Sequence, residues 1–561
     1  MKSFFNLQPA IISATKNYSR DKFVSDILAG LIVSIVALPL AIAFGIASGV
    51  SPETGLITAI VGGFMVALLG GCSVQIAGPT GAFIVILHGI IENFGFEGLI
   101  VSTVMAGMIL VILGVLKMGT VIKFIPYPIV VGFTSGIAIT IFTSQVKDLL
   151  GLTVDNLPSE FVYKWGAYFS VFNTIDPYTF GVGLLTILTI IFTPKISKKI
   201  PGSLVALVLM TGLTFLLRNN FGVDSIETIG DKFTINAAFP TPRWINIDFK
   251  MINQLLPSAI TIALLCAIES MLSAIVADGV TGDKHDSNME LVAQGAANIM
   301  SPFFGGIPVT GAAARTMTNI SNGAKTPVAG VIHAIVLLLI LVFLGPLTRL
   351  IPMACLAGVL AVVSYNMADW KTFGSLLKGS KSDVAVLLAT FTLTIFFDLT
   401  IAIMVGLLMA MVLFMKRIAN ITKVSVAIDK LELDQEDDVA HDEEVLTISK
   451  GVEVYEIDGP FFFGVANKFD VVMGLLANAP KVRVIRMRKV PFMDTTGVHN
   501  LRMMIRSSHS EGIKIVLSGV RDDVRKTLQN FGFNQLIGEE NICSNIHEAL
   551  KVANKFVESK E

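Results

Sequence analysis

Residues Ala77–Leu87 read AGPTGAFIVIL, and this stretch sets the problem that the fold has to solve. Its apolar run continues only to about Ile91, before Glu92 and Asn93. That is too short for a helix that crosses a bilayer, which needs roughly 20 apolar residues. The stretch also begins with Gly-Pro, which breaks helices. It therefore predicts a half-length helix that starts inside a membrane, behind a break in the chain.

The rest of the chain has the composition of a polytopic membrane protein. Of its 561 residues, 53% are hydrophobic and 15% are charged, whereas soluble proteins have about 25% charged residues. Long apolar runs separated by short polar loops stop near Arg417. We predict four regions: a cytoplasmic N-terminal segment (1–26), a transmembrane transporter domain (27–417), an acidic linker (418–444) and a small α/β domain (445–561).

The net charge and the cysteine content exclude few classes of protein, and neither indicates a cofactor. The net charge of −1 does not point to nucleic acid, and none is predicted as a partner. The four cysteines are scattered, so we predict neither a disulfide framework nor a metal site. The sequence shows no set of residues that is typical of a catalytic site. We therefore expect a protein that is not an enzyme and needs no cofactor.

The apolar runs predict fourteen helices in the membrane, of which the third and the tenth are short. They are expected at 27–49, 54–70, 80–91, 97–116, 128–147, 177–193, 201–218, 257–278, 288–304, 313–322, 327–344, 350–366, 383–397 and 399–415. With the N-terminus inside, the internal loops hold most of the loop lysines, which agrees with the positive-inside rule. We expect a multi-pass protein of the cell inner (plasma) membrane with both termini in the cytoplasm.

Two pairs of segments echo each other. GGCSVQIAGPTGAF at 70–83 is similar to GGIPVTGAAART at 305–316, and Lys123–Pro126 is similar to Arg349–Pro352. Seven spans separate the members of each pair, and an odd number reverses direction across the membrane. The halves are therefore predicted to be inverted repeats with interrupted helices at matching positions, which is typical of secondary transporters. The alternative is a chance echo between Gly-rich membrane segments.

The repeats explain the opening stretch. Extended backbone at membrane depth must be buried in protein or line a cavity, so 72–77 and 306–311 are expected to pair as short strands. The half-helices that follow then begin mid-membrane with unpaired N–H groups and the positive end of the helix dipole. Two such ends would bind an anion. Small residues leave the backbone reachable at Thr80, Gly81 and Ala82 and at Ala312, Ala313 and Ala314.

Ionisable and aromatic residues nearby are candidates for coupling and for the wall of the site. Glu269 lies in the middle of an apolar helix, with Ser273 one turn later, and an acid there is a functional candidate or a structural acid between helices. Arg315 either adds positive charge to the anion site or pairs with Glu269. Phe44 is either a wall of the cavity or ordinary packing. His88 and His333 are interpreted as structural.

The tail changes to alternating strands and helices. Strands are expected at 452–459, 482–490 and 514–519, and residues 429–444 form a densely acidic stretch typical of a solvated linker. The DTTG sequence at 494–497 opens a helix. Asp494 or Thr495 caps that helix, and the sharper alternative is a regulatory phosphosite at Thr496.

These motifs resemble the SulP family of anion transporters, which includes prestin. The resemblance rests on ADGVTGDKHDSNMEL (277–291), QGAANIMSPFFGGIPVTGAAART (294–316) and a STAS-like tail with FFFG (461–464) and DTTG. It implies a 7+7 inverted fold of core and gate domains, usually in a homodimer. The substrate site that it implies comprises Phe44, Thr80, Gly81, Ala82, Glu269, Ala313, Ala314 and Arg315.

Two departures from the family pattern affect the expected substrate and coupling ion. Sodium-coupled bicarbonate members carry Asp where Glu269 stands and Thr where Ser273 stands, which favours protons over sodium at this coupling pair. Animal members have Phe where Thr80 stands, so their chloride selectivity does not carry over.

We expect a secondary active transporter that takes up sulfate or a similar oxyanion with protons, by an elevator-like movement. The alternatives are a bicarbonate or C4-dicarboxylate transporter, an uncoupled anion channel or exchanger, and a membrane sensor that signals through its STAS domain.

Overall fold

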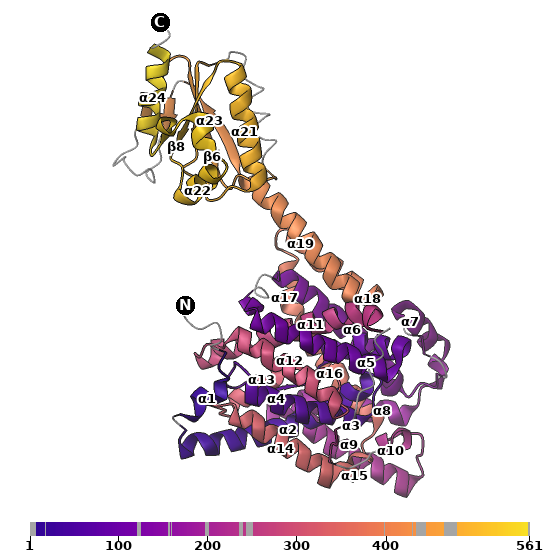
Figure 1. Ribbon diagram of the computed structural model, residues 1–561. Coiled ribbons are helices and arrows are strands. Elements are labelled where there is room, and N and C mark those ends of the chain that lie inside the picture. The colour runs from indigo at the N-terminus through magenta and orange to yellow at the C-terminus, as the bar shows by residue number, and fades with distance from the viewer. Residues whose placement is uncertain are drawn as a thin grey trace. The chain divides into compact units, whose positions relative to one another are not determined.

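The chain divides into two compact units, Met1–Met409 and Ala410–Glu561. The structure is a computed structural model, shown in Figure 1. It describes residues 7–16, 18–120, 125–154, 157–158, 160–196, 201–234, 239–242, 251–397, 399–428, 430–432, 445–464 and 480–558. Each unit is described by itself below.

The larger unit is a bundle of apolar helices. Ten helical stretches in the described part of the chain are long and apolar enough to cross a membrane. They are α2 (Arg20–Ala47), α3 to α4 (Pro52–Leu69), α5 with the turn before it (Gly81–Val115), α6 (Tyr127–Leu150), α8 (Pro177–Ile196), α9 (Gly202–Phe221), α11 (Ile252–Thr281), α14 to α15 (Val328–Thr348), α16 to α17 (Met353–Leu376) and most of α19 (Leu399–Ile421).

Shorter helices and one break complete this pattern. Helices α12 (Ser287–Phe303), α13 (Ala313–Ser321) and α18 (Lys381–Phe396) lie between the longer ones. Helix α5 is broken at Gly95, whose φ of 69° is left-handed and favours glycine. The predicted third and fourth helices are therefore separate segments. The observed arrangement is consistent with the fourteen membrane helices that we predicted. Residues 148–176, which lie between the helices predicted at 128–147 and 177–193 and are predicted to form a loop, contain a helix that we did not expect, α7 (Phe161–Ser170).

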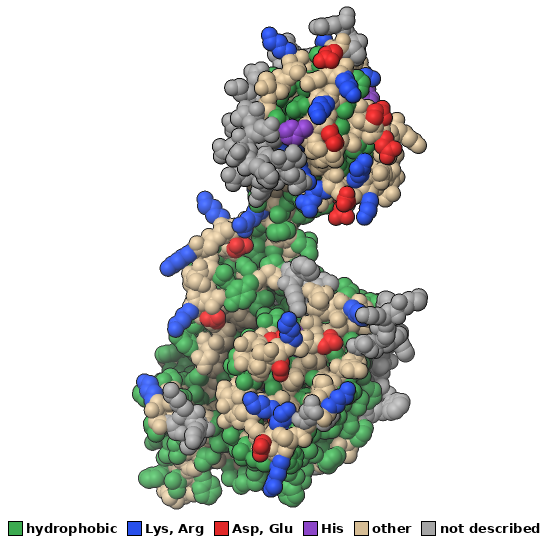
Figure 2. Space-filling model, turned by 90° about the vertical axis from the view of Figure 1, so that its left-hand side faces the viewer, with side chains coloured by type: hydrophobic (Ala, Val, Ile, Leu, Met, Phe, Trp, Pro, Cys, Tyr) green, Lys and Arg blue, Asp and Glu red, His purple; other side chains and the backbone are tan. Residues whose placement is uncertain are grey.

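The helices of the larger unit pack as two bundles. In the first, which we call the core bundle, α2 packs on α3, α13 and α14, and α5 packs on α11 and α12. In the second, the gate bundle, α6 packs on α16 and α18, and α8 packs on α9 and α16. Each bundle combines helices from both halves of the chain. Hydrophobic side chains cover much of the outer surface of this unit (Figure 2).

The second sequence echo has a structural counterpart in the gate bundle. Pro126 is the extended residue before α6, and Pro352 is the extended residue before α16. Because proline lacks a backbone N–H, it fits where a helix has no partner for one. Lys123, the first residue of the echo, lies outside the described residues.

The smaller unit is an α/β domain. Strands β3 (Lys423–Ala427), β6 (Val452–Asp458), β7 (Val482–Arg486), β8 (Lys514–Ser518) and β9 (Ile542–Cys543) form one sheet in that order. Strand β3 is antiparallel to β6, and the remaining pairs are parallel. Helices α21 (Thr495–Ser510), α22 (Asp522–Asn530), α23 (Phe533–Ile537) and α24 (Ile546–Glu558) complete the domain. The strands predicted at 452–459, 482–490 and 514–519 are confirmed.

The range that we assigned to a linker contains structure at its start. Strand β3 lies inside 418–444 and pairs with β6 from Lys423 to Ala427. A small hairpin of β4 (Lys430–Glu432) and β5 (Val445–Thr447) follows. The acidic residues 433–444 between these two strands lie outside the described residues.

Candidate functional site

The two interrupted segments meet inside the core bundle. Strand β1 (Ala77–Gly78) pairs antiparallel with β2 (Thr310–Gly311), with Ala77 opposite Gly311. The N–H of Ala312 also donates to the carbonyl of Ile76 at 2.9 Å. The predicted pairing between the two repeats is therefore confirmed, and the antiparallel register is the one that inverted repeats require.

Side chains from neighbouring helices satisfy the extended backbone around these strands. Asn298 on α12 donates to the carbonyl of Val309 at 2.8 Å and accepts its N–H at 2.9 Å. Thr316 accepts the N–H of Ile76 at 3.0 Å, and Ser270 accepts the N–H of Gly311 at 3.0 Å. Because no water is available in a bilayer core, unpaired backbone groups there are costly. These side chains allow extended backbone at membrane depth.

A buried carboxylate holds the Gly-Gly turn of the first repeat. Glu290 is fully buried and accepts the N–H groups of Gly71 at 2.9 Å and Cys72 at 3.2 Å. It also accepts the side-chain amides of Gln75 at 2.8 Å and Gln294 at 2.9 Å. Our sequence reasoning did not single out Glu290. The only signal available was an acid near the start of an otherwise uncharged helix.

The first half-helix end is closely packed. Thr80 is extended and precedes a tight turn, Gly81–Phe83, that leads into α5. Gly81 is buried, and a Cβ placed on it would lie 3.0 Å from Ile141, 3.4 Å from the Phe44 ring and 3.6 Å from Met367. Phe44 therefore does lie against this end, whereas Ile141 and Met367 come from the gate bundle.

The second half-helix end is open. Ala312 is the extended residue before α13, and the side chains of Ala313 and Ala314 are exposed. The first N–H groups of an α-helix have no partner within the helix, and the helix dipole adds partial positive charge there. Methyl side chains leave room for an anion to approach these groups.

Glu269 and Thr80 are in direct contact. The Thr80 hydroxyl donates to Glu269 Oε2 at 2.9 Å, which joins α11 to the first half-helix end. Glu269 is half-buried, so it is open on one side. Ser273 is fully buried instead, and its hydroxyl donates to Thr316 at 3.1 Å. In this conformation the Ser273 hydroxyl is engaged, and its role with a coupling ion stays a prediction.

Arg315 crosses from the second half-helix to the first. Its side chain is 2% exposed, and Nη2 donates to the carbonyl of Pro79. Nη1 is buried without a hydrogen-bond partner in the described part of the structure, beside Gly78. Among the described residues no salt bridge joins Arg315 to Glu269. The guanidinium therefore lies beside the backbone of Gly78 and Pro79, at the end of β1, and it has an unused donor.

The two histidines and the DTTG motif are the remaining residues that the sequence analysis considered. His333 is fully buried, and its Nδ1 lies 3.3 Å from the Ser34 hydroxyl, as expected of a structural histidine. His88 is exposed on α5. In the smaller unit Asp494 caps α21 by accepting the N–H of Gly497 at 2.7 Å. Thr496 is exposed in the first turn of that helix, and its phosphorylation stays a prediction.

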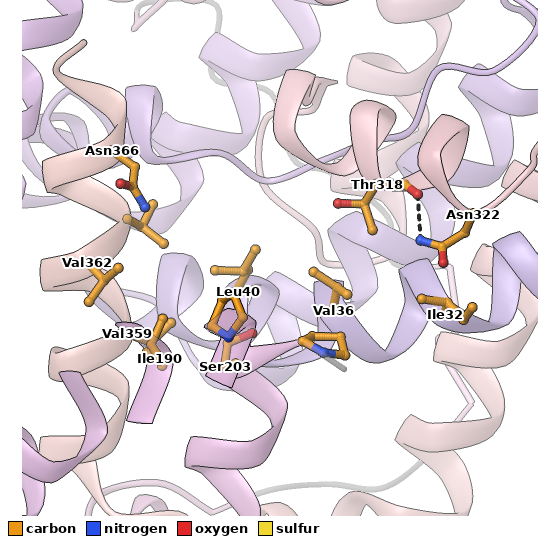
Figure 3. Close-up of a pocket in the computed structure, with 14 residues that line it drawn as sticks. Ile32, Val36, Leu40, Ile190, Ser203, Thr318, Asn322, Val359, Val362 and Asn366 are labelled. Carbon is orange, nitrogen blue, oxygen red and sulfur yellow. Dashed lines mark hydrogen bonds between the residues drawn. The ribbon is translucent and has the colours of Figure 1, made fainter. Parts of the chain in front are cut away.

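A cavity of about 360 Å³ lies between the core and gate bundles (Figure 3). Thr318 of α13 and Asn322, the residue after this helix, line it on one side, and Asn366 and Val362 of α16 line it on the other. The remaining lining residues are Ile32, Val36 and Leu40 of α2, Ile190 and Pro194 of α8, Pro201, Gly202, Ser203, Val359 and Val363. Leu40 lies one helical turn before Phe44 on α2. The cavity therefore extends along α2, which carries Phe44, and along α13, which begins at the second half-helix end.

Two family models match the chain. Residues 23–390 match the Sulfate permease family, and residues 445–549 match the STAS domain. The chain is 38% identical over 527 residues to the putative sulfate transporter YvdB of Bacillus subtilis, which covers 94% of this chain and 97% of that protein. It is 31% identical over 556 residues to the bicarbonate transporter BicA of Picosynechococcus, covering 94% of each.

A solved structure has the same fold. The murine Solute Carrier 26 family member A9 anion transporter, solved in the inward-facing state, superposes with a TM-score of 0.87. The match covers 99% of this chain and 95% of that chain at 18% identity. At this identity the likeness concerns the fold alone.

Proposed function

The chain belongs to the sulfate permease family of anion transporters and carries a C-terminal STAS domain, and on that premise we propose proton-coupled uptake of sulfate or a similar oxyanion. The observation that carries the proposal is that two half-helices begin directly after a pair of antiparallel strands inside the larger unit. Their free N–H groups and helix dipoles attract an anion without any dedicated side chain.

The anion lies between Thr80–Ala82 and Ala313–Ala314 in this proposal. Exposed methyl groups at the second end give it access, and Phe44 forms an apolar wall against the first end. Arg315 supplies a positive charge from its place beside Gly78 and Pro79. Its unused Nη1 donor is consistent with that role. In this arrangement the backbone N–H groups and the buried guanidinium of Arg315 provide most of the attraction for the anion.

Glu269 is the coupling acid in this proposal. It is half-buried and bonded to Thr80, so a change in its protonation acts directly on the first half-helix end. An uncompensated charge at the centre of a bilayer costs several kcal/mol. A loaded core bundle with neutral Glu269 therefore crosses more easily than one with charged Glu269, and the proton travels with the anion. Sodium in place of the proton is the alternative coupling ion.

Movement of the core bundle relative to the gate bundle carries the anion across. Both half-helix ends belong to the core bundle, so the site moves as one body. The cavity between the two bundles is lined by Thr318 of the core and Val359 of the gate, and it provides a path from one side of the membrane. With the N-terminus inside, that side is the cytoplasm. We further propose a homodimer in the inner membrane with both termini cytoplasmic.

Bicarbonate is the second candidate substrate. A relative with 31% identity over 94% of the chain is named a bicarbonate transporter. A site that is built mainly of backbone N–H groups has no side chain that would discriminate between the two oxyanions. The choice of anion therefore has to come from transport measurements.

Uptake into proteoliposomes with a panel of labelled anions tests the proposal. We expect sulfate to accumulate when a proton gradient is imposed, and unlabelled sulfate to compete more strongly than bicarbonate or succinate. Preferential uptake of bicarbonate would move the assignment to the second candidate. Uptake of no anion by protein that is folded and inserted would contradict the proposal.

A further inference from the structure

Helix α7 is attached to the gate bundle by one face. Its Tyr168 is 1% exposed, and the phenol donates to the carbonyl of Thr143 on α6 at 2.9 Å. The indole of Trp165 donates to the Thr143 hydroxyl at 3.3 Å. The ring of Phe161 lies 5.6 Å from that of Phe396, at the end of α18. Figure 1 shows α7 at the periphery of the larger unit.

The opposite face of α7 is exposed and carries no charged side chain. Val162 is 61% exposed, Tyr163 65% and Phe169 69%. Gly166 and Ser170 lie on the same face at helical spacing, and both are exposed. Charged groups usually mark the solvent face of a helix, and contiguous exposed apolar surface marks an interaction site. This face has the composition of a surface that is covered.

The place where α7 is attached sets its depth relative to the spans. Thr143 precedes Leu150, the last residue of α6, by seven positions. At 1.5 Å per residue, that is about 10 Å below the end of this spanning helix. Helix α6 has 24 residues, or about 36 Å, and a hydrocarbon core is about 30 Å thick, so an α6 centred in the bilayer places Thr143 about 7 Å inside the core. Interfacial helices bury their apolar face to a similar depth of about 5–10 Å. Helix α7 is therefore expected at the level of the membrane surface and not in the water above it.

Further exposed aromatic side chains lie close to α7, either in space or in the chain. Phe396 and Phe397 at the end of α18 are 51% and 63% exposed, next to the contact with Phe161. Phe172 and Tyr178, which follow α7 in the chain, are both 53% exposed. Tyr and Trp gather at the level of the headgroups in membrane proteins because one part of the side chain is apolar and another is polar. Tyr163 and Tyr178 are of this kind, and the phenylalanines add apolar surface beside them.

We propose that α7 is an interfacial helix whose exposed face, Val162, Tyr163, Gly166, Phe169 and Ser170, is covered by lipid of the leaflet at which α6 ends. Because α6 and α18 hold its other face, α7 fixes the level of the gate bundle in the bilayer. The proposal holds whichever anion is transported.

Spin labels on introduced cysteines test this contact in the full chain. The four native cysteines are free and buried, so they give little background labelling. The test positions are Phe169→Cys and Val162→Cys. Leu209→Cys, in the middle of α9 and 53% exposed, is the lipid reference. Asn220→Cys, near the end of α9 on the same side of the membrane, is the water reference.

Collision rates in proteoliposomes distinguish the occupants. We expect both test positions to collide readily with oxygen, as Leu209→Cys does, and much less with a water-soluble nickel chelate than Asn220→Cys does. Nickel access equal to that of Asn220→Cys would overturn the proposal in favour of water. Protection from both reagents, with spin–spin broadening, would overturn it in favour of a second copy of the chain.

Discussion

The two half-helix ends come from matching segments of the repeats, yet their surroundings differ. At the first end Gly81 and Ala82 are buried, and residues of the gate bundle lie within van der Waals contact. At the second end Ala313 and Ala314 are exposed. One end is thus closed by its neighbours while the other is accessible.

The difference shows how inverted repeats form an asymmetric site. The strands are related by the repeat and pair with each other, but each half recruits different side chains. The first end receives a carboxylate through Thr80 and Glu269. The second end sends a guanidinium across to Pro79. The backbone supplies what is common to both ends, and single side chains supply the coupling acid and the fixed positive charge.

The largest effect is expected at the Gly-Gly turn of the first repeat, which packs directly against backbone. A Cβ on Gly71 would lie 2.1 Å from the carbonyl oxygen of Asp286, which is backbone and cannot rotate away. Gly71→Ala should therefore destabilise the protein by about 1–3 kcal/mol. In Gly306→Ala the nearest atom is the Ser301 hydroxyl, so we expect a smaller loss of about 1 kcal/mol from its bond to Ile307.

Thermal unfolding in detergent measures this pair of variants. Gly89→Ala is the matched control, because a Cβ there meets no atom within 4 Å. Equal losses for Gly71→Ala and Gly306→Ala would show that the two turns do not differ as described.

The next effect concerns access to the open end. Ala313→Leu should nearly abolish anion uptake, because a large side chain covers the first N–H groups of α13. Ala313→Ser keeps the side chain small and should retain uptake. Because the Ala313 side chain is exposed, folding should be preserved in both variants, which thermal unfolding checks. Parental uptake by a folded Ala313→Leu variant would contradict the assignment of the anion to this end.

The smallest effect concerns the contact at the closed end. Thr80→Val removes the hydrogen bond to Glu269, whereas Thr80→Ser keeps it. A typical hydrogen bond contributes about 1 kcal/mol, or roughly a fivefold change in an equilibrium constant. We expect the apparent proton-dissociation constant of transport, read from the pH at which transport is half-maximal, to change roughly fivefold in Thr80→Val and to stay unchanged in Thr80→Ser. An equal shift in both variants would mean that the hydroxyl bond does not tune Glu269.

Sequence patterns predicted the elements that follow from local rules. The short run before Glu92 and the Gly-Pro break predicted the first half-helix, and the echo at 305–316 predicted its partner and the strand pairing. Apolar runs gave helix positions close to those observed, since length and hydropathy decide which segments span. The candidate positions Thr80–Ala82 follow from the same break, and the candidate positions Ala312–Ala314 follow from the similar segment at 305–316.

Contacts between distant segments could not be predicted in this way. Glu290 acts on a turn more than 200 positions away, and nothing local distinguishes it from a surface acid. Helix α7 is short and mixed in composition, so it was interpreted as a loop. Strand β3 was assigned to the linker because its identity as a strand depends on pairing with β6. Ser273 was aligned with Glu269 by helical spacing, but its hydroxyl bonds Thr316.

The most direct test of the account is the response of the parent and of Glu269→Gln to a proton gradient in sealed proteoliposomes. Glutamine resembles the protonated acid, and its amide oxygen can still accept the Thr80 hydroxyl. We predict that the parent concentrates labelled anion when protons flow inward, whereas the variant still exchanges anion but no longer concentrates it. Accumulation by the variant in response to the gradient would contradict the role of Glu269. A parent that responds to sodium and not to protons would contradict proton coupling.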